Sequence, residues 1–182
     1  MANLDAPMGF NPVRNPHGAT IPSDPYTVTA SQAVAPGTIV YLTDAGTIQA
    51  YTGTTTGRTN ILGAAIGSVA AAATDRVVEV ANSPEQEYEV QSDDASITAL
   101  TDMLGANFAG TNLATVHTTL IQSRGEIDGS TGTSVNNSTT IRPFRALRFS
   151  RVTDEDTTVS YPSVVVKINS LNHIMATGSG VL

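Results

Sequence analysis

The sequence predicts a mainly β protein, a small barrel-like or sandwich domain with one short α-helix and an extended N-terminal arm. Two observations carry this prediction. Short stretches of alternating apolar and polar residues, rich in Val, Thr, Ile and Tyr, recur along most of the chain between Gly, Pro, Asp and Asn turn signals. In contrast, five of the nine prolines lie in the first 25 residues, before this pattern begins.

Residues 1–25 are expected to form the arm, whose prolines are Pro7, Pro12, Pro16, Pro22 and Pro25. Proline lacks a backbone donor and biases its predecessor towards extended conformations, so little regular structure is expected. A disordered terminus is the alternative, but a solvated tail has little use for its apolar residues. We therefore expect an arm that becomes ordered on a partner. Its candidate contact residues are Met8, Phe10, Pro12, Val13, Arg14 and Pro16.

Residues 26–175 are expected to form the β-rich body, followed by a flexible tail at 176–182. Strands are predicted at 26–29, 38–43, 47–51, 61–69, 76–81, 87–91, 118–122, 139–152 and 163–169. Gly63 interrupts the apolar stretch 61–69, which indicates a strand packed closely on a neighbour. The Val-rich stretch 163–169 is expected to be central or covered on both faces.

One helix is predicted at about 97–104. Ser96 can cap its N-terminus, and Gly105 lies where a C-terminal stop is expected. A helix of about two turns is marginal alone, so it should pack on the sheet. Residues 125–138 are rich in Gly, Ser, Thr and Asn and are expected to form a loop.

Composition disfavours or excludes several classes of function. The net charge of −7 disfavours direct nucleic-acid binding, which needs a basic excess to neutralise phosphates. The absence of cysteine excludes disulfides, thiolate metal sites and cysteine catalysis. The most apolar run, residues 61–73, is too short and too polar to span a bilayer, so no membrane association is expected.

No arrangement of residues predicts catalysis. His17, His117 and His173 are not at metal-ligand spacing from one another or from paired carboxylates. Three glutamates, Glu85, Glu87 and Glu89, alternate along one predicted strand and share a face, which is more typical of a solvated edge than of a cation site. We expect no catalytic residue, cofactor or metal, and so no enzyme.

The most concentrated charge lies in Arg142, Arg145, Arg148 and Arg151. Steps of three alternate faces on a strand, so Arg142 and Arg148 are expected on one face and the other two on the opposite face. These side chains are candidates for contact with acidic residues of a partner or a neighbouring subunit. Pairing with the chain's own surplus carboxylates is the alternative, and both interpretations stay open.

Two sets of segments resemble known families. Residues 35–42, 46–51, 61–65 and 71–80 resemble, in their order of turns and strands, the lambda-type head decoration proteins. That family has a small β domain, the β-tulip, and usually forms trimers on phage capsids. Residues 1–14, 83–91 and 164–169 are similar to a family of tailed-phage head proteins described as capsid-stabilising or cement proteins. One departure is His173, which lies four residues beyond Asn169 rather than closer to it.

The resemblance implies a structural virion protein, made in the host cytoplasm, that binds the outer capsid surface and cements neighbouring subunits of the major capsid protein. It also implies a homo-oligomer, with a trimer favoured over a dimer. Two alternatives remain. One is another virion component, associated with the tail or fibre and contacting a host. The other is a ligand-binding β-barrel, although the sequence lacks the convergent His, Asp or Trp residues that such a site uses.

Overall fold

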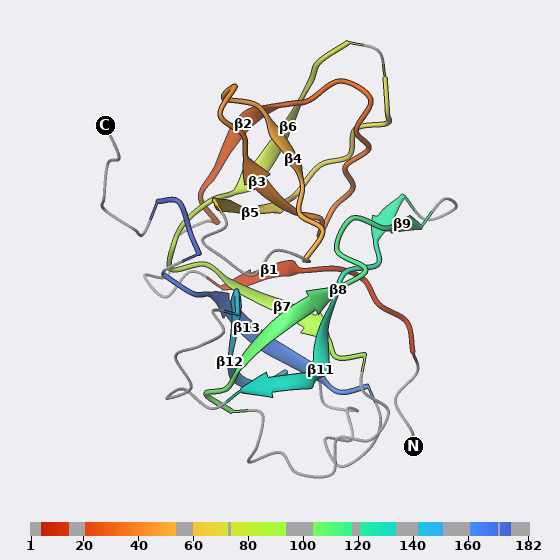
Figure 1. Cartoon of the computed structure of the whole chain (residues 1–182). Coiled ribbons are helices and arrows are strands. Elements are labelled where there is room, and N and C mark those ends of the chain that lie inside the picture. Colours follow the sequence, from red (N-terminus) through yellow and green to blue (C-terminus); the bar gives the residue numbers. More distant parts are fainter. Residues whose placement is uncertain are drawn as a thin grey trace.

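The computed structural model describes residues 5–14, 21–53, 60–72, 74–93, 104–117, 121–133, 142–150, 161–170 and 172–175. These residues are mainly β, as the sequence predicts, and form a closed barrel that lies above a curled sheet (Figure 1). In the described part of the chain, no helix is long and apolar enough to cross a membrane.

Five strands close the barrel in the order β2-β4-β3-β5-β6. Their bounds are β2 (Ser23–Val28), β3 (Ile39–Leu42), β4 (Ile48–Ala50), β5 (Ile61–Ala65) and β6 (Arg76–Ala81). Closure leaves no open edge, because β6 pairs antiparallel with β2 and β2 pairs parallel with β4. The barrel interior is filled by Val28, Val34, Val40, Ile48, Leu62, Ala65, Val69, Val78 and Val80.

Six strands form the sheet in the order β1-β7-β13-β12-β8-β11. Their bounds are β1 (Asn11–Arg14), β7 (Glu87–Gln91), β8 (Asn107–Thr111), β11 (Glu126–Thr133), β12 (Phe144–Phe149) and β13 (Ser163–Ile168). The sheet curls back on itself, since Ser92 bridges Ile127 and the Asp93 N–H donates to the Ile127 carbonyl over 3.0 Å. A small hairpin, β9 (Val116–His117) and β10 (Gln122–Ser123), lies beside it.

One hydrophobic core joins the barrel to the sheet. Strand β5 is buried along its whole length, because it contributes Leu62 and Ala65 to the barrel interior and Ile61 and Ala64 to this shared core. The expectation of a strand packed closely on a neighbour is confirmed. The shared core comprises Phe10, Ile39, Tyr51, Ile61, Ala64, Ala81, Tyr88, Val90, Ala106, Phe108, Leu113, Ile127, Phe144, Ala146, Val164, Val166 and Ile168.

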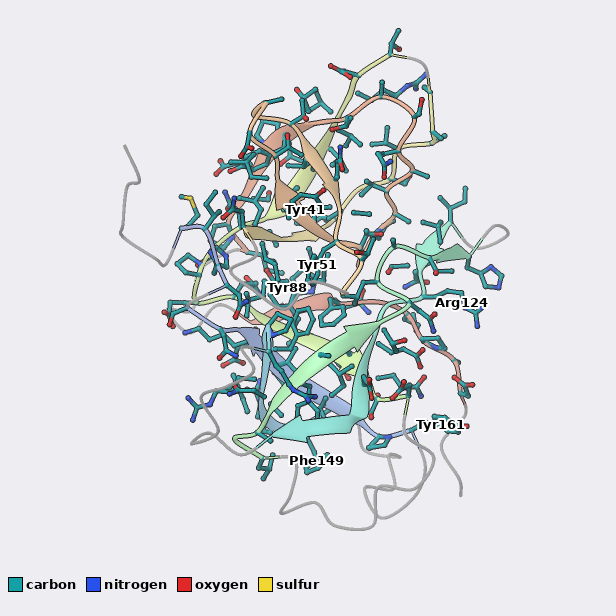
Figure 2. All side chains as sticks on the ribbon, in the orientation of Figure 1. Tyr41, Tyr51, Tyr88, Arg124, Phe149 and Tyr161 are labelled. Carbon is teal, nitrogen blue, oxygen red and sulfur yellow. The ribbon has the colours of Figure 1, made fainter. Side chains whose placement is uncertain are left out.

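One close contact between the two parts involves Gly63 and Ala81 of the barrel and Tyr88 of the sheet. Figure 2 shows Tyr51 and Tyr88 in the space between barrel and sheet. The Tyr88 hydroxyl donates to the Ala81 carbonyl over 2.8 Å. A Cβ atom on Gly63 would lie 1.9 Å from that same carbonyl oxygen, so only glycine fits at this position.

Several expectations differ from the structure. Asn11–Arg14 and Ser23–Val28 are strands, so residues 1–25 are not wholly without regular structure, and the barrel begins three residues before the expected start of the body at residue 26. Strand β11 occupies most of the predicted loop at 125–138, and β8 was not predicted. Of the predicted helix only Leu104 is described, and the tail at 176–182 lies outside the described residues.

Candidate interaction surface

The N-terminal segment is held between the barrel and the sheet at Gly9. The N–H of Phe10 donates to the Gly37 carbonyl over 2.9 Å, at a barrel turn. Gly9 and Gly37 both have positive φ, +75° and +82°, and a Cβ on Gly9 would lie 2.8 Å from the Gly37 oxygen. Two glycines are therefore needed for the two backbones to approach this closely.

Phe10 has a core role in place of the partner contact expected of it. Its side chain is fully buried, and its ring centroid lies 4.6 Å from that of Phe144 on β12. The segment that carries Phe10 is part of the body in this conformation. Removal of residues 1–14 would therefore remove a core aromatic, Phe10, and the edge strand β1.

Two exposed residues in and beside this strand are apolar. Met8 is 55% exposed and Val13 is 41% exposed. Val13 is the extra residue of a bulge, because Pro12 pairs with Tyr88 and Arg14 with Glu87. A proline and a bulge both hinder pairing of an edge strand with another chain. Strand β1 therefore presents side chains to a partner more readily than it presents its backbone.

A third exposed apolar residue, Ile121, belongs to the hairpin that contacts this segment. The side chain of Gln122 donates to the Met8 carbonyl over 3.1 Å, which ties the hairpin to the N-terminal segment. Ile121 is 58% exposed and has a φ of +49°. A β-branched residue in the left-handed region costs about 1–3 kcal/mol, and strain of this kind is concentrated at functional sites. Met8, Val13 and Ile121 together are called the apolar patch below.

Of the two predicted contact residues Arg14 and Pro16, the structure describes only the backbone of Arg14. The backbone of Arg14 lies in β1, opposite Glu87, whereas its side chain lies outside the description. Pro16 lies outside the described residues altogether. Pro12 is half-buried, with its backbone opposite Tyr88.

On the sheet face turned away from the shared core, called the outer face, the predicted row of glutamates meets basic residues. Glu87 and Glu89 share this face, as alternation along β7 requires. The Arg148 guanidinium lies 2.7 Å from the Glu87 carboxylate, and the Lys167 ammonium lies 2.5 Å from Glu85. Ser150 donates to Glu89. For Arg148, pairing with the chain's own carboxylates is the interpretation that holds.

The arginines do not alternate as predicted. Ala146 pairs with Val166 and Arg148 with Val165, so β12 carries an extra residue, Leu147, in a β-bulge. The extra residue shifts the alternation of side chains along the strand by one position. Arg145 and Arg148 therefore both lie on the outer face instead of on opposite faces. Bulges commonly re-aim a side chain in this way.

Arg145 lies beside another cation. It is exposed and directly opposite Lys167 on β13. In the part of the chain that the structure describes, the Arg145 side chain makes no ion pair or hydrogen bond. Both cations line a shallow depression of about 350 Å³, together with Gly105, Ala146, Leu147, Ile168, Asn169 and Ser170.

The other two arginines do not extend this group. Arg142 lies just before β12, is half-buried, and its carbonyl accepts a hydrogen bond from the Asn169 amide. Arg151 lies outside the described residues. The structure thus brings Arg145 and Arg148 together and gives Arg142 a position off the strand.

His173 is a structural residue. It is 1% exposed, its Nδ1 accepts a hydrogen bond from the Met175 N–H, and its backbone bridges Ile61 of the barrel. Burial and the nearby Lys167 cation lower the pKa of His173 to about 4, against weaker opposing effects of Glu85 and the Leu62 backbone. The imidazole is therefore neutral at pH 7 and anchors residues 172–175 to the barrel. His117 is half-buried on the hairpin, and His17 lies outside the described residues.

The barrel carries a groove of about 590 Å³ that sequence reasoning missed. Its lining is largely uncharged and polar, and the Tyr41 hydroxyl donates to the Gln49 side chain over 2.8 Å. Asp44 is the one carboxylate among its described lining residues, so the groove offers no acid–base pair. Nowhere in the described ranges do three His, Asp or Glu side chains gather as a metal site would require.

Comparison with protein-family models, with curated proteins and with solved structures finds no match to this chain. Its function must be inferred from its residues and their arrangement.

Proposed function

We propose that this chain is a structural virion protein that binds the outer surface of a tailed-phage capsid and cements neighbouring subunits of the major capsid protein. The observation that carries the proposal is the fold of residues 35–80. Those residues resemble decoration proteins in their order of turns and strands, and they form most of one closed barrel, β3 to β6 with β2 completing it. We propose that this barrel corresponds to the β-tulip of that family.

The polar side chains support a structural role. Three buried polar side chains of the described residues serve the fold: Tyr88 joins barrel to sheet, Asn82 donates to Asp24 and to the Tyr26 hydroxyl, and His173 holds residues 172–175. A protein that strengthens a shell needs a rigid body and a contact surface. Binding only to the assembled shell stabilises that form by mass action.

The proposed contact with the capsid is the apolar patch of Met8, Val13 and Ile121. Full burial of a Met or Val side chain contributes roughly 1.5–3 kcal/mol, so a few such residues suffice for a modest contact per copy. Several copies linked in one oligomer raise the avidity by roughly 10²–10⁴. The proposed contact keeps Met8 and Val13 from the residues that the sequence predicts. It contains Ile121 in place of Phe10, which is buried.

Co-sedimentation with purified heads lacking the protein tests this function. The wild-type chain should pellet with heads in a saturable manner, and not with unassembled capsid protein. The double variant Met8→Ser and Val13→Ser should bind about tenfold more weakly or worse, since it loses two buried apolar side chains. Val77→Ser is the matched control, because Val77 is 62% exposed on the barrel and lies outside the patch. Failure of the wild-type chain to pellet would refute the proposal.

A second candidate function is a ligand-binding β-barrel, favoured by the groove that Tyr41 and Gln49 line. A polar lining with a single carboxylate, Asp44, suits a neutral, hydroxyl-rich ligand better than an ion. Isothermal titration with neutral oligosaccharides separates the two candidates, because the capsid proposal requires no such binding.

A further inference from the structure

The outer face carries one cation, Arg145, that has no carboxylate partner among the described residues, although the chain as a whole is acidic. Arg145 and Lys167 lie directly opposite each other on β12 and β13. Like charges in this position destabilise a sheet unless an anion lies nearby. Glu85 pairs with Lys167 and Glu87 with Arg148, whereas the third carboxylate of this face, Glu89, accepts from Ser150. Among the described residues, Arg145 therefore has no carboxylate in direct contact.

The surroundings of Arg145 form a site in which a carboxylate would fit. The depression of about 350 Å³ contains both cations and the polar side chains of Asn169 and Ser170. Leu147 at its edge is 37% exposed, and Leu104, next to Gly105, is 46% exposed. A guanidinium with an ammonium beside it binds a carboxylate strongly, and the exposed leucines provide apolar contact around it. Arg145, Lys167 and this lining are called the basic depression.

The same protein carries an excess of negative charge at the other end of β7. Asp93 follows the strand, and Glu126 begins β11 where the sheet closes. Asp5 lies at this end too, because the N–H of Ala6 donates to the Gln91 side chain over 3.0 Å. Burial, and then the charges of Asp5 and Asp93, raise the pKa of the Glu126 carboxyl, while the Asn112 amide and Arg124 oppose the shift. This group is called the acidic end.

The basic depression and the acidic end cannot meet within one molecule. Lys167 pairs with Glu87 at the beginning of β7, and Asp93 lies six residues further along the chain. At about 3.4 Å per residue the two ends are roughly 20 Å apart along the strand. Two complementary surfaces at opposite ends of one body can meet only between copies, in a head-to-tail contact that builds a ring when its rotation closes.

We propose that the protein self-associates head to tail, with the acidic end of one copy docked in the basic depression of the next. Arg145 is the central contact of this interface, and Asp5, which is exposed, is its counterpart on the neighbouring copy. The bulge at Leu147 has a purpose in this arrangement, since it places Arg148 on the same face as Arg145. The inference deepens the proposed function, because a cement protein gains avidity from being an oligomer.

A charge-swap series measured by sedimentation velocity tests the interface. The wild-type chain should associate, and raising the salt from about 0.05 M to about 0.5 M should weaken the association, as Debye screening requires. Arg145→Glu and Asp5→Lys should each weaken self-association about tenfold or more. The double variant Arg145→Glu and Asp5→Lys should recover most of it, whatever the number of copies, because every interface then carries the reversed pair.

Matched controls separate the contact from the change in net charge. Arg76→Glu and Asp75→Lys make the same charge changes at exposed barrel positions and should associate as the wild type does. Circular dichroism establishes that each variant is folded. A wild-type chain that stays monomeric at about 0.1 mM in low salt would overturn the inference, as would a double variant no better than the single ones. Head binding by a monomeric wild-type chain would leave the proposed function standing and the head-to-tail contact refuted.

Discussion

Tyr88 of the sheet donates its hydroxyl hydrogen to the backbone carbonyl of Ala81 in the barrel, over 2.8 Å and in full burial. This bond connects the last residue of β6 to the strand that follows it, at the point where the chain passes from barrel to sheet. The Ala81 carbonyl also lies against Gly63, so these three residues form one of the contacts through which the two parts meet.

Tyr88→Phe should lower the free energy of unfolding by about 1–3 kcal/mol, because the buried Ala81 carbonyl loses its side-chain partner. Urea denaturation followed by circular dichroism measures the change. Tyr161→Phe is the control, since Tyr161 is half-exposed and its hydroxyl makes no hydrogen bond among the described residues. Equal stability of the two variants would contradict the role given to Tyr88.

Gly63→Ala should be among the most damaging single changes, with a loss of about 3 kcal/mol or failure to fold. Its Cβ would lie 1.9 Å from the Ala81 oxygen, so β5 and β6 would have to separate. Gly46→Ala is a suitable comparison, because Gly46 has a φ of +77° but no atom within 4 Å of an added Cβ. The Gly46→Ala variant should lose only about 1–2 kcal/mol of stability, which is typical of an alanine in the left-handed region. Thermal unfolding distinguishes the two variants.

Phe10→Ala should destabilise the protein by about 3–5 kcal/mol, since it leaves a cavity beside Phe144 in the shared core. Met8→Ala, two residues away and exposed, should change stability by no more than about 0.5 kcal/mol. The measurement is the urea midpoint of each variant. A Phe10→Ala protein as stable as wild type would show that the N-terminal segment is an arm without a core role.

Acidification should destabilise the fold through His173. Its pKa is about 4 in the folded protein against 6.5 when unfolded, so between these values the unfolded state binds a proton that the folded state does not. Stability therefore falls as the pH drops from 6.5 to 4, by about 3 kcal/mol at roughly 1.4 kcal/mol per pH unit. Glu126 has the opposite effect on stability. Its pKa is raised in the folded protein, so the folded state binds this proton more tightly and acidification favours the fold.

Comparison of variants isolates the contribution of His173. His173→Asn retains an acceptor for the Met175 N–H but has no titrating group, so its stability should depend less on pH between 6.5 and 4. His117→Asn, at a half-exposed hairpin position, should keep the wild-type dependence. Parallel curves for wild type and His173→Asn would contradict the assignment.

Much of the fold could be predicted because its strands have strong local signals. The β-branched, apolar run of β13 predicts a central strand, and its pairing with both β7 and β12 confirms this. The run from Ile61 to Ala65 is apolar throughout because both faces of β5 are covered. The alternation of Glu87 and Glu89 likewise predicts their common face.

Other features depend on partners that are distant in sequence. Glu126–Thr133 contains Gly, Asp and Ser and has little local tendency to form a strand, but pairing with β8 makes it one. The bulge at Leu147 has no local sequence signal, and it reverses the expected faces of Arg145 and Arg148. Phe10 lies among prolines, which predict an arm. Only its burial in the shared core shows that it belongs to the body.

The most direct test of the central claim is a pair of electron-microscopy reconstructions of phage heads, one with the protein and one from particles that lack it. The account predicts added density on the outer surface, repeated at equivalent capsid positions, into which the barrel and sheet fit with Met8 and Val13 against the shell. Identical reconstructions, or density only at the tail, would contradict it.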